Sequence, residues 1–190
     1  MTAIVALKHK GIIYLAGDRC GSNGYSKSLG SNPKIFKTGE FYLGYTSSFY
    51  MGQILEHIWT PPPRSEGLSD NVYFYKHVVP SLRNCLVDNH YGKYFDEEHK
   101  EPNLGSFIII YKNKIFVHHS NGAVIEVEYA GVGCGGESVL SSVLCMLDLA
   151  KIVPGFTPDM NNVFNRAFAR CAEFYCGVSP EFDLMEIAIG

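Results

Sequence analysis

Residues 1–20 read MTAIVALKHKGIIYLAGDRC, with two apolar runs on either side of a short turn at residues 9–11. Short apolar runs joined by a turn that contains glycine predict a β-hairpin. The first strand starts at Thr2, one residue after the initiator methionine, and the second ends on Asp18. The first residues of most domains are poorly ordered, so a strand that begins at a hydroxyl residue calls for a functional explanation.

The rest of the chain alternates between stretches of strand and helix character. After the first hairpin the pattern predicts a loop or irregular strand pair at 21–32, a hairpin at 34–48, helices at 49–59 and about 69–92, an exposed loop at 93–105, strands across 106–133 with turns at 112–113 and 121–122, helices at 135–151 and 159–173, and a closing strand at 181–189. We expect Ser69 or Asp70 to cap the second helix and Pro80 to kink it. The order β-β-β-β-α-α-β-β-α-α-β predicts a single α+β domain over 1–190, built from packed layers.

Composition and charge argue against several classes of protein. The chain has 190 residues and a formal net charge of −3, which gives no electrostatic case for binding nucleic acid or an anionic membrane. No signal peptide and no apolar run of about 18 residues is visible, so we expect a cytoplasmic protein. The six cysteines form no C-x-x-C pair, and His118 and His119 point to opposite faces of a predicted strand. We therefore expect neither a metal nor a cofactor.

Thr2 is a candidate nucleophile if Met1 is removed. A threonine hydroxyl is a weak nucleophile until a base accepts its proton. A free α-amine, with an unperturbed pKa of about 7.7–8.0, would lie within reach of the hydroxyl of the same residue. A nearby cation would favour the ionised hydroxyl, and a carboxylate would hold that cation in place. The sequence offers Asp18 and Lys34 for these tasks, although each residue type alone is usually a turn residue or a solvated lysine at such positions.

The spacing of these three residues resembles that of the proteasome β-subunit family, which includes the bacterial HslV peptidase. Asp18 follows Thr2 by sixteen residues and Lys34 follows it by thirty-two, as in that family of threonine-type N-terminal nucleophile hydrolases. The surrounding runs IVALK, LAGDR and KIFK are similar as well, and residues 108–136 resemble the central hairpin of the family and its Gly-Ser-Gly turn. The resemblance implies a four-layer αββα sandwich, which agrees with the order of elements.

The resemblance also implies catalytic roles for three residues that depart from the family pattern. Cys134 stands where the family has the serine of its Gly-Ser-Gly turn, and Glu173 and Cys176 match a C-terminal Asp and Ser. A thiol is a weaker hydrogen-bond donor than a hydroxyl, so we expect proton transfer near the Thr2 amine to be weakened. A cysteine that replaces Thr2 as nucleophile is the weaker reading, because no histidine lies nearby in sequence and many cysteines are simply buried.

A second set of residues is implied for substrate binding. Ser47 matches the residue whose backbone N–H forms the oxyanion hole, and Ser48 follows it where the family has glycine. A backbone N–H is kept when serine replaces glycine, but the side chain narrows the pocket or alters the backbone path. Tyr45 and Arg19 match family positions that flank the substrate pocket, although Tyr45 would serve equally well as a core residue.

The function implied is that of a threonine peptidase that cleaves polypeptides inside a homo-oligomeric ring. The helices at about 48–59 and 69–92 are apolar around most of their surface, which favours contacts between subunits, with packing inside the monomer as the alternative. The resemblance makes an ATP-dependent unfoldase a possible partner. The sequence does not identify that unfoldase. Two other functions stay open. One is a catalytically inactive or unprocessed assembly protein, and the other is a small-molecule amidase of the broader N-terminal nucleophile group.

Overall fold

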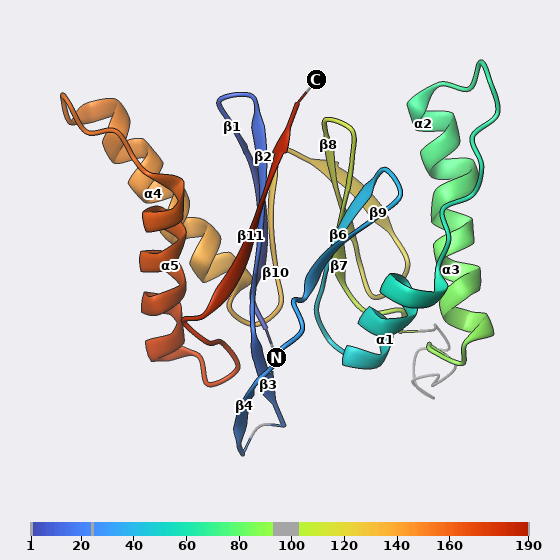
Figure 1. Ribbon diagram of the computed structural model, residues 1–190, viewed down its shortest axis with the longest axis horizontal. Coiled ribbons are helices and arrows are strands. Elements are labelled where there is room, and N and C mark those ends of the chain that lie inside the picture. The colour runs from blue at the N-terminus through green and yellow to red at the C-terminus, as the bar shows by residue number, and fades with distance from the viewer. Residues whose placement is uncertain (1, 24, 93–102, 190) are drawn as a thin grey trace.

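The computed structural model describes residues 2–23, 25–92 and 103–189 of the chain. Two β-sheets face each other between two layers of helices (Figure 1). One outer layer contains α4 (Gly136–Ile152) and α5 (Met160–Phe174), and the other contains α1 (Phe49–Gln53), α2 (Asp70–Tyr73) and α3 (Val79–Asp88). This order of helix, sheet, sheet and helix confirms the four-layer α+β sandwich predicted from the sequence.

The first sheet is built around the N-terminal hairpin, in the strand order β10-β1-β2-β11. Its antiparallel strands are β1 (Ile4–His9), β2 (Ile12–Asp18), β10 (Tyr129–Val132) and β11 (Phe182–Ala188). Lys10 and Gly11 have φ values of 49° and 77°, the left-handed conformation of a tight hairpin turn. The predicted hairpin is confirmed, and its register pairs Ile4 with Gly17, which brings the start of β1 beside the end of β2.

The second sheet has the strand order β5-β6-β7-β8-β9. Its strands are β5 (Ile35–Thr38), β6 (Phe41–Tyr45), β7 (Phe107–Tyr111), β8 (Lys114–His118) and β9 (Val124–Val127). Every side chain of β7 is buried, because helices cover one face of this central strand and the first sheet covers the other. Lys112 and Gly122 have positive φ values of 53° and 83°, in agreement with the turns predicted there.

The helices that follow β6 are irregular. Helix α1 continues into a π-helical turn at Ile54–Ile58, and α2 passes through another at Phe74–Val78 before α3 begins. The Ser69 hydroxyl accepts a hydrogen bond from the Val72 N–H and caps α2, as predicted. Pro80 has no N–H for the helical ladder, and the second π-helical turn ends just before it, where the sequence predicts a kink.

The stretch at 21–32, predicted as a loop or an irregular strand pair, contributes to a short two-stranded arm, β3 (Cys20–Ser22) and β4 (Lys27–Leu29), that extends beyond the sandwich (Figure 1). One part of the predicted order of elements differs from the structure. The predicted order places two strands between the helix pairs, which is wrong, because four strands form there. Strand β10 follows β9 almost without a break and crosses to the first sheet, and apolar periodicity does not show which sheet a strand joins. Most of the predicted loop at 93–105 lies outside the described residues.

Apolar side chains fill three spaces, one between the sheets and one beneath each helical layer. Two glycines let the sheets approach closely at the end where β2 finishes. A Cβ atom added to Gly17 or Gly44 would lie 2.7 or 2.6 Å from the Ile4 side chain, so a larger residue would push the sheets apart. Among the described helices, none is both long enough and apolar enough to cross a membrane.

Candidate active site

Three of the predicted residues meet at the end of the sandwich where β1 begins and β2 ends. The Thr2 hydroxyl donates a hydrogen bond to the Asp18 carboxylate and accepts one from the Lys34 ammonium. Lys34 Nζ lies 2.9 Å from Asp18 Oδ1. The exposed fractions of Thr2, Asp18 and Lys34 are 2, 0 and 3%. The structure therefore brings the three residues into one buried, hydrogen-bonded cluster.

Backbone groups complete the hydrogen bonding of the two buried charges. Asp18 Oδ1 accepts from the Ala3 N–H at 2.9 Å, and Oδ2 accepts from the N–H groups of Cys20 at 3.0 Å and Ser179 at 3.3 Å. Lys34 Nζ also donates to the Cys20 carbonyl at 2.6 Å. A buried charge is strongly unfavourable unless it is paired and hydrogen-bonded. These bonds hold the carboxylate and the ammonium in fixed positions beside Thr2.

Strand pairing explains why residues so far apart in sequence meet. The β1–β2 register continues past Ile4, since the Asp18 N–H donates to the Ala3 carbonyl at 3.1 Å. Lys34 directly precedes β5, and its carbonyl accepts from the Tyr45 N–H at 3.1 Å, which ties it to β6 in the second sheet. The cluster thus spans the two sheets at the end where Gly17 and Gly44 let them approach closely. The separation of sixteen residues follows from the length of the β1–β2 hairpin, and the β3–β4 arm lies between Asp18 and Lys34.

A small pocket of about 70 Å³ opens beside the cluster. Its lining consists mainly of hydroxyl and aromatic side chains, namely Thr2, Ser22, Lys34, Tyr45, Thr46, Ser47, Ser48 and Phe49. Tyr45 is 6% exposed and packs against Gly52, where a Cβ atom would collide with its ring. Burial raises the pKa of Tyr45 to about 12, so its phenol is neutral at cellular pH. Tyr45 therefore acts both as a core residue and as a wall of the pocket.

Ser47 lies in this pocket with a left-handed backbone, at φ 67°. Its side-chain oxygen lies 3.1 Å from Thr46 Oγ1 and accepts from the Ser106 N–H at 3.4 Å. Among the hydrogen bonds between described residues, none uses the Ser47 N–H, so that donor is available to a ligand in the pocket. Ser48 caps α1 by accepting from the Tyr50 N–H at 3.1 Å, which fixes the turn that contains Ser47.

Cys134 and Arg19 lie beside the cluster without entering its hydrogen bonds. The Cys134 thiol is exposed and donates to the Thr2 carbonyl at 3.5 Å, so it faces the backbone of Thr2. Arg19 forms an ion pair with Asp183 of β11 and does not line the pocket. Its guanidinium supports the site by holding the end of β2 against β11.

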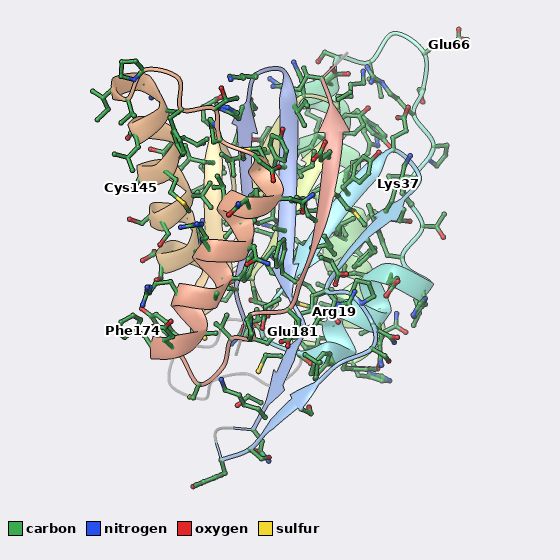
Figure 2. The ribbon with its side chains drawn as sticks, turned by 60° about the vertical axis from the view of Figure 1, so that its left-hand side comes forward. Arg19, Lys37, Glu66, Cys145, Phe174 and Glu181 are labelled. Atoms are coloured by element: carbon green, nitrogen blue, oxygen red, sulfur yellow. The ribbon has the colours of Figure 1, made fainter. Side chains whose placement is uncertain are left out.

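The structure does not bring Glu173 and Cys176 to the cluster. Glu173 lies in the last turn of α5 and pairs with Arg170 at 2.6 Å. Cys176 is exposed, and within the described part of the chain it makes no hydrogen bond to the cluster. Figure 2 shows the neighbouring Phe174 at the far end of α5, well away from Arg19.

The residue of this C-terminal segment that contacts the cluster is Ser179, which the sequence analysis missed. Its N–H donates to Asp18, and its hydroxyl accepts from the Arg19 N–H at 3.2 Å and donates to the Glu181 carbonyl at 2.9 Å. Arg19 and Glu181 lie next to each other in Figure 2. Ser179 stands three residues before β11, and its burial, which distinguishes it from other loop serines, is visible only in the folded chain.

Two other groups near the site remain uncharged. Burial raises the pKa of the Cys20 thiol, with a further contribution from the Asp18 carboxylate, so Cys20 stays protonated. Burial lowers the pKa of His118 in β8 to about 4, so its ring is neutral, whereas His119 is exposed. Within the described ranges, no three His, Cys, Asp or Glu side chains lie close enough together to hold a metal ion.

Several solved structures share this fold. The chain is similar to the BPH protein of Thiobacillus denitrificans, with a TM-score of 0.76 and 18% identity over 100% of this chain and 99% of that one. A complex of BPH with epoxomicin gives a TM-score of 0.70 and 16% identity over 100% of both chains. HslV from Trypanosoma brucei gives a TM-score of 0.63 and 16% identity over 98% of this chain and 99% of that one. No protein-family model and no curated protein sequence matches the chain.

These likenesses confirm the fold expected from the resemblance, that of the proteasome-type N-terminal nucleophile hydrolases. They extend over the whole chain, although fewer than one residue in five is identical.

Proposed function

We propose that the chain is a threonine-type N-terminal nucleophile peptidase that cleaves polypeptides once Met1 has been removed. The observation that carries this proposal is the buried Thr2 hydroxyl, placed between the Asp18 carboxylate and the Lys34 ammonium at the edge of a pocket. The likeness to an epoxomicin-bound structure adds support from the fold. The pocket beside Thr2 is small and partly apolar, and it suits a substrate side chain rather than a cofactor.

In the first half of the reaction, the free Thr2 amine accepts the hydroxyl proton while Lys34 stabilises the developing charge on Oγ1. Oγ1 then attacks the carbonyl carbon of the scissile amide. The carbonyl oxygen becomes an oxyanion, which the Ser47 N–H stabilises. The C–N bond breaks, the leaving amine takes the proton held by the Thr2 amine, and the acyl group remains on Oγ1 as an ester.

In the second half, water replaces the leaving amine in the pocket. The Thr2 amine accepts a proton from this water, and the resulting hydroxide attacks the ester carbonyl. The bond between the acyl carbon and Oγ1 breaks, Oγ1 regains its proton, and the product acid leaves. Asp18 keeps Lys34 oriented through both halves and takes no part in the proton transfers.

One observation favours the second candidate, a catalytically silent assembly protein. The side chains that the resemblance places around the Thr2 amine are replaced or displaced. Cys134 has a thiol where the family has a serine hydroxyl, and Glu173 forms an ion pair with Arg170 instead of approaching Thr2. The experiment that separates the two candidates is hydrolysis of an unstructured polypeptide by chain that begins at Thr2. We expect cleavage that is lost in Thr2→Ala and at least partly kept in Thr2→Ser, whereas no cleavage by homogeneous, assembled protein would favour the silent candidate.

We further propose that copies of the chain assemble into a closed ring that encloses the Thr2 sites. We place this assembly in the cytoplasm and propose an ATP-dependent unfoldase as a candidate partner. The helical layer of α1 to α3 buries Leu55 and Trp59. In the same layer, the exposed fractions of Phe49, Ile58 and Tyr75 are 49, 53 and 42%. Contiguous exposed apolar surface is typical of protein interfaces, and the proposed ring would cover these side chains. Closed rings are a common form of homo-oligomer.

Assembly predicts a particle much heavier than the 21.1 kDa chain in light scattering at micromolar concentration. The double change Ile58→Asp and Tyr75→Asp should lower that mass, because each places a charge on exposed apolar surface. Lys76→Asp, at an exposed position in the same helical layer, is the matched control and should leave the mass unchanged. A wild-type mass near that of a single chain would contradict the ring.

A further inference from the structure

His118 is a buried histidine whose role the proposed mechanism does not yet include. It ends β8, has no exposed surface, and stacks on the Phe107 ring with 4.3 Å between centroids and 13° between planes. Its Nδ1 lies 3.3 Å from the Gly105 carbonyl, and since a carbonyl can only accept, Nδ1 carries the proton. Within the described residues, Nε2 has no hydrogen-bond partner. An apolar residue would avoid that unsatisfied nitrogen, so the Nδ1 bond is the feature that calls for histidine here.

The Gly105 carbonyl belongs to a short segment that needs support to keep its shape. Gly105 has a φ of 71°, and its N–H donates to Asn103 Oδ1 at 3.0 Å. On the other side, the Leu104 N–H donates to the Ser120 carbonyl at 2.8 Å. His118 adds the bond to the Gly105 carbonyl, so the segment is anchored to the strand β8 and the turn that follows it.

The next residue along, Ser106, holds the loop that carries the Ser47 N–H. Its carbonyl accepts from Thr46 Oγ1 at 2.8 Å and from the Thr46 N–H at 3.2 Å. Its own N–H donates to the Ser47 side-chain oxygen at 3.4 Å. A continuous path of bonded groups therefore runs from His118 through Gly105 and Ser106 to Ser47.

Ser47 depends on this support because it is not a glycine. A non-glycine residue with positive φ is strained and persists only when its surroundings determine it. At φ 67°, the direction of the Ser47 N–H is fixed by the Ser106 contacts just described together with the bond from the Ser48 N–H to the Thr46 carbonyl at 2.7 Å. A small rotation of this peptide would move the donor away from a developing oxyanion, and such donors act only when they are well placed.

We propose that His118 is a positioning residue that, through Gly105 and Ser106, aims the Ser47 N–H at the oxyanion. This inference rests on the proposed peptidase function. It assigns the Nδ1–H donor, rather than the aromatic ring, as the feature of His118 that the reaction needs. A residue that acts only on the transition state should change kcat and leave KM nearly unchanged.

The test measures hydrolysis of a short peptide amide by the processed, assembled chain. It compares three variants of His118 with wild type. In His118→Asn the side-chain NH₂ lies near the position that Nδ1 has in wild type. In His118→Gln the side-chain NH₂ lies near the position of Nε2, and leucine in His118→Leu has no hydrogen-bond donor. We expect kcat to fall about tenfold or more in the Gln and Leu variants, with KM within about twofold, and the Asn variant to stay within about threefold of wild type. His119→Leu, on the exposed neighbour, is the control and should match wild type.

Two results would overturn the role of His118. One is a folded Gln or Leu variant with wild-type kcat, and the other is an equal loss in the Asn and Gln variants, which would show a structural role. Thermal unfolding of each variant identifies loss of fold, and the comparison of Asn with Gln remains decisive if Leu does not fold. Failure of the proposed function looks different, because wild-type protein and the His119→Leu control would then also be inactive.

Discussion

Replacing Lys34 with alanine is expected to lower the rate of peptide hydrolysis by about 10²–10³-fold or more. Lys34 Nζ donates to the Thr2 hydroxyl from a buried position, where a positive charge strongly favours the ionised oxygen. Steady-state hydrolysis by processed chain measures the effect. A Lys34→Ala protein within about threefold of wild-type turnover would show that this ammonium is not part of the chemistry.

The fold should survive this change, because the partner carboxylate keeps its other bonds. Without Lys34, Asp18 still accepts from the backbone N–H groups of Ala3, Cys20 and Ser179. Unfolding of Lys34→Ala should therefore stay cooperative. Lys37→Ala provides the matched control, since Lys37 is exposed in β5 three residues further on, and it should leave the rate within about twofold of wild type.

The central cluster could be predicted from sequence because the spacing of Thr2, Asp18 and Lys34 resembles that of the proteasome β-subunit family. Thr2, Asp18 and Lys34 each stand at the start or end of a predicted strand, so the lengths of the hairpins determine where they meet. The apolar patterns of the helices and the glycines in the turns act over short distances, and these local features gave correct elements along most of the chain. The order of the elements indicated layered α+β packing, and the resemblance supplied the four-layer arrangement.

The rest of the site depends on contacts that local sequence does not reveal. Ser179 reaches Asp18 across 161 residues of sequence, through the course of the chain between α5 and β11. The resemblance implied catalytic roles for Glu173 and Cys176 in this segment, but α5 continues through Phe174 and carries Glu173 into the solvent. His118 was visible only as one of two adjacent strand histidines, because its bond to Gly105 arises from a left-handed backbone that only the folded chain shows.

The state of the Thr2 amine is expected to decide activity completely. In the proposed mechanism this amine is both the base that activates the hydroxyl and the donor to the leaving group. With Met1 attached, the same nitrogen is part of a peptide bond and has no basic lone pair. We expect chain that keeps Met1 to show no hydrolysis above background, although Asp18 and Lys34 still surround the hydroxyl in that form. Removal of Met1 from the same preparation should restore full activity.

The most direct test of a Thr2 nucleophile is intact-mass and peptide-mapping spectrometry after treatment with an epoxyketone such as epoxomicin. Such a reagent needs both the hydroxyl and the free amine of an N-terminal threonine. Chain that begins at Thr2 should gain the mass of one inhibitor, mapped to the N-terminal peptide, and neither Thr2→Ala nor chain that keeps Met1 should gain any. An assembled, homogeneously processed sample that stays unmodified, or an adduct mapped to Cys134 instead, would contradict the assignment of Thr2 as the nucleophile.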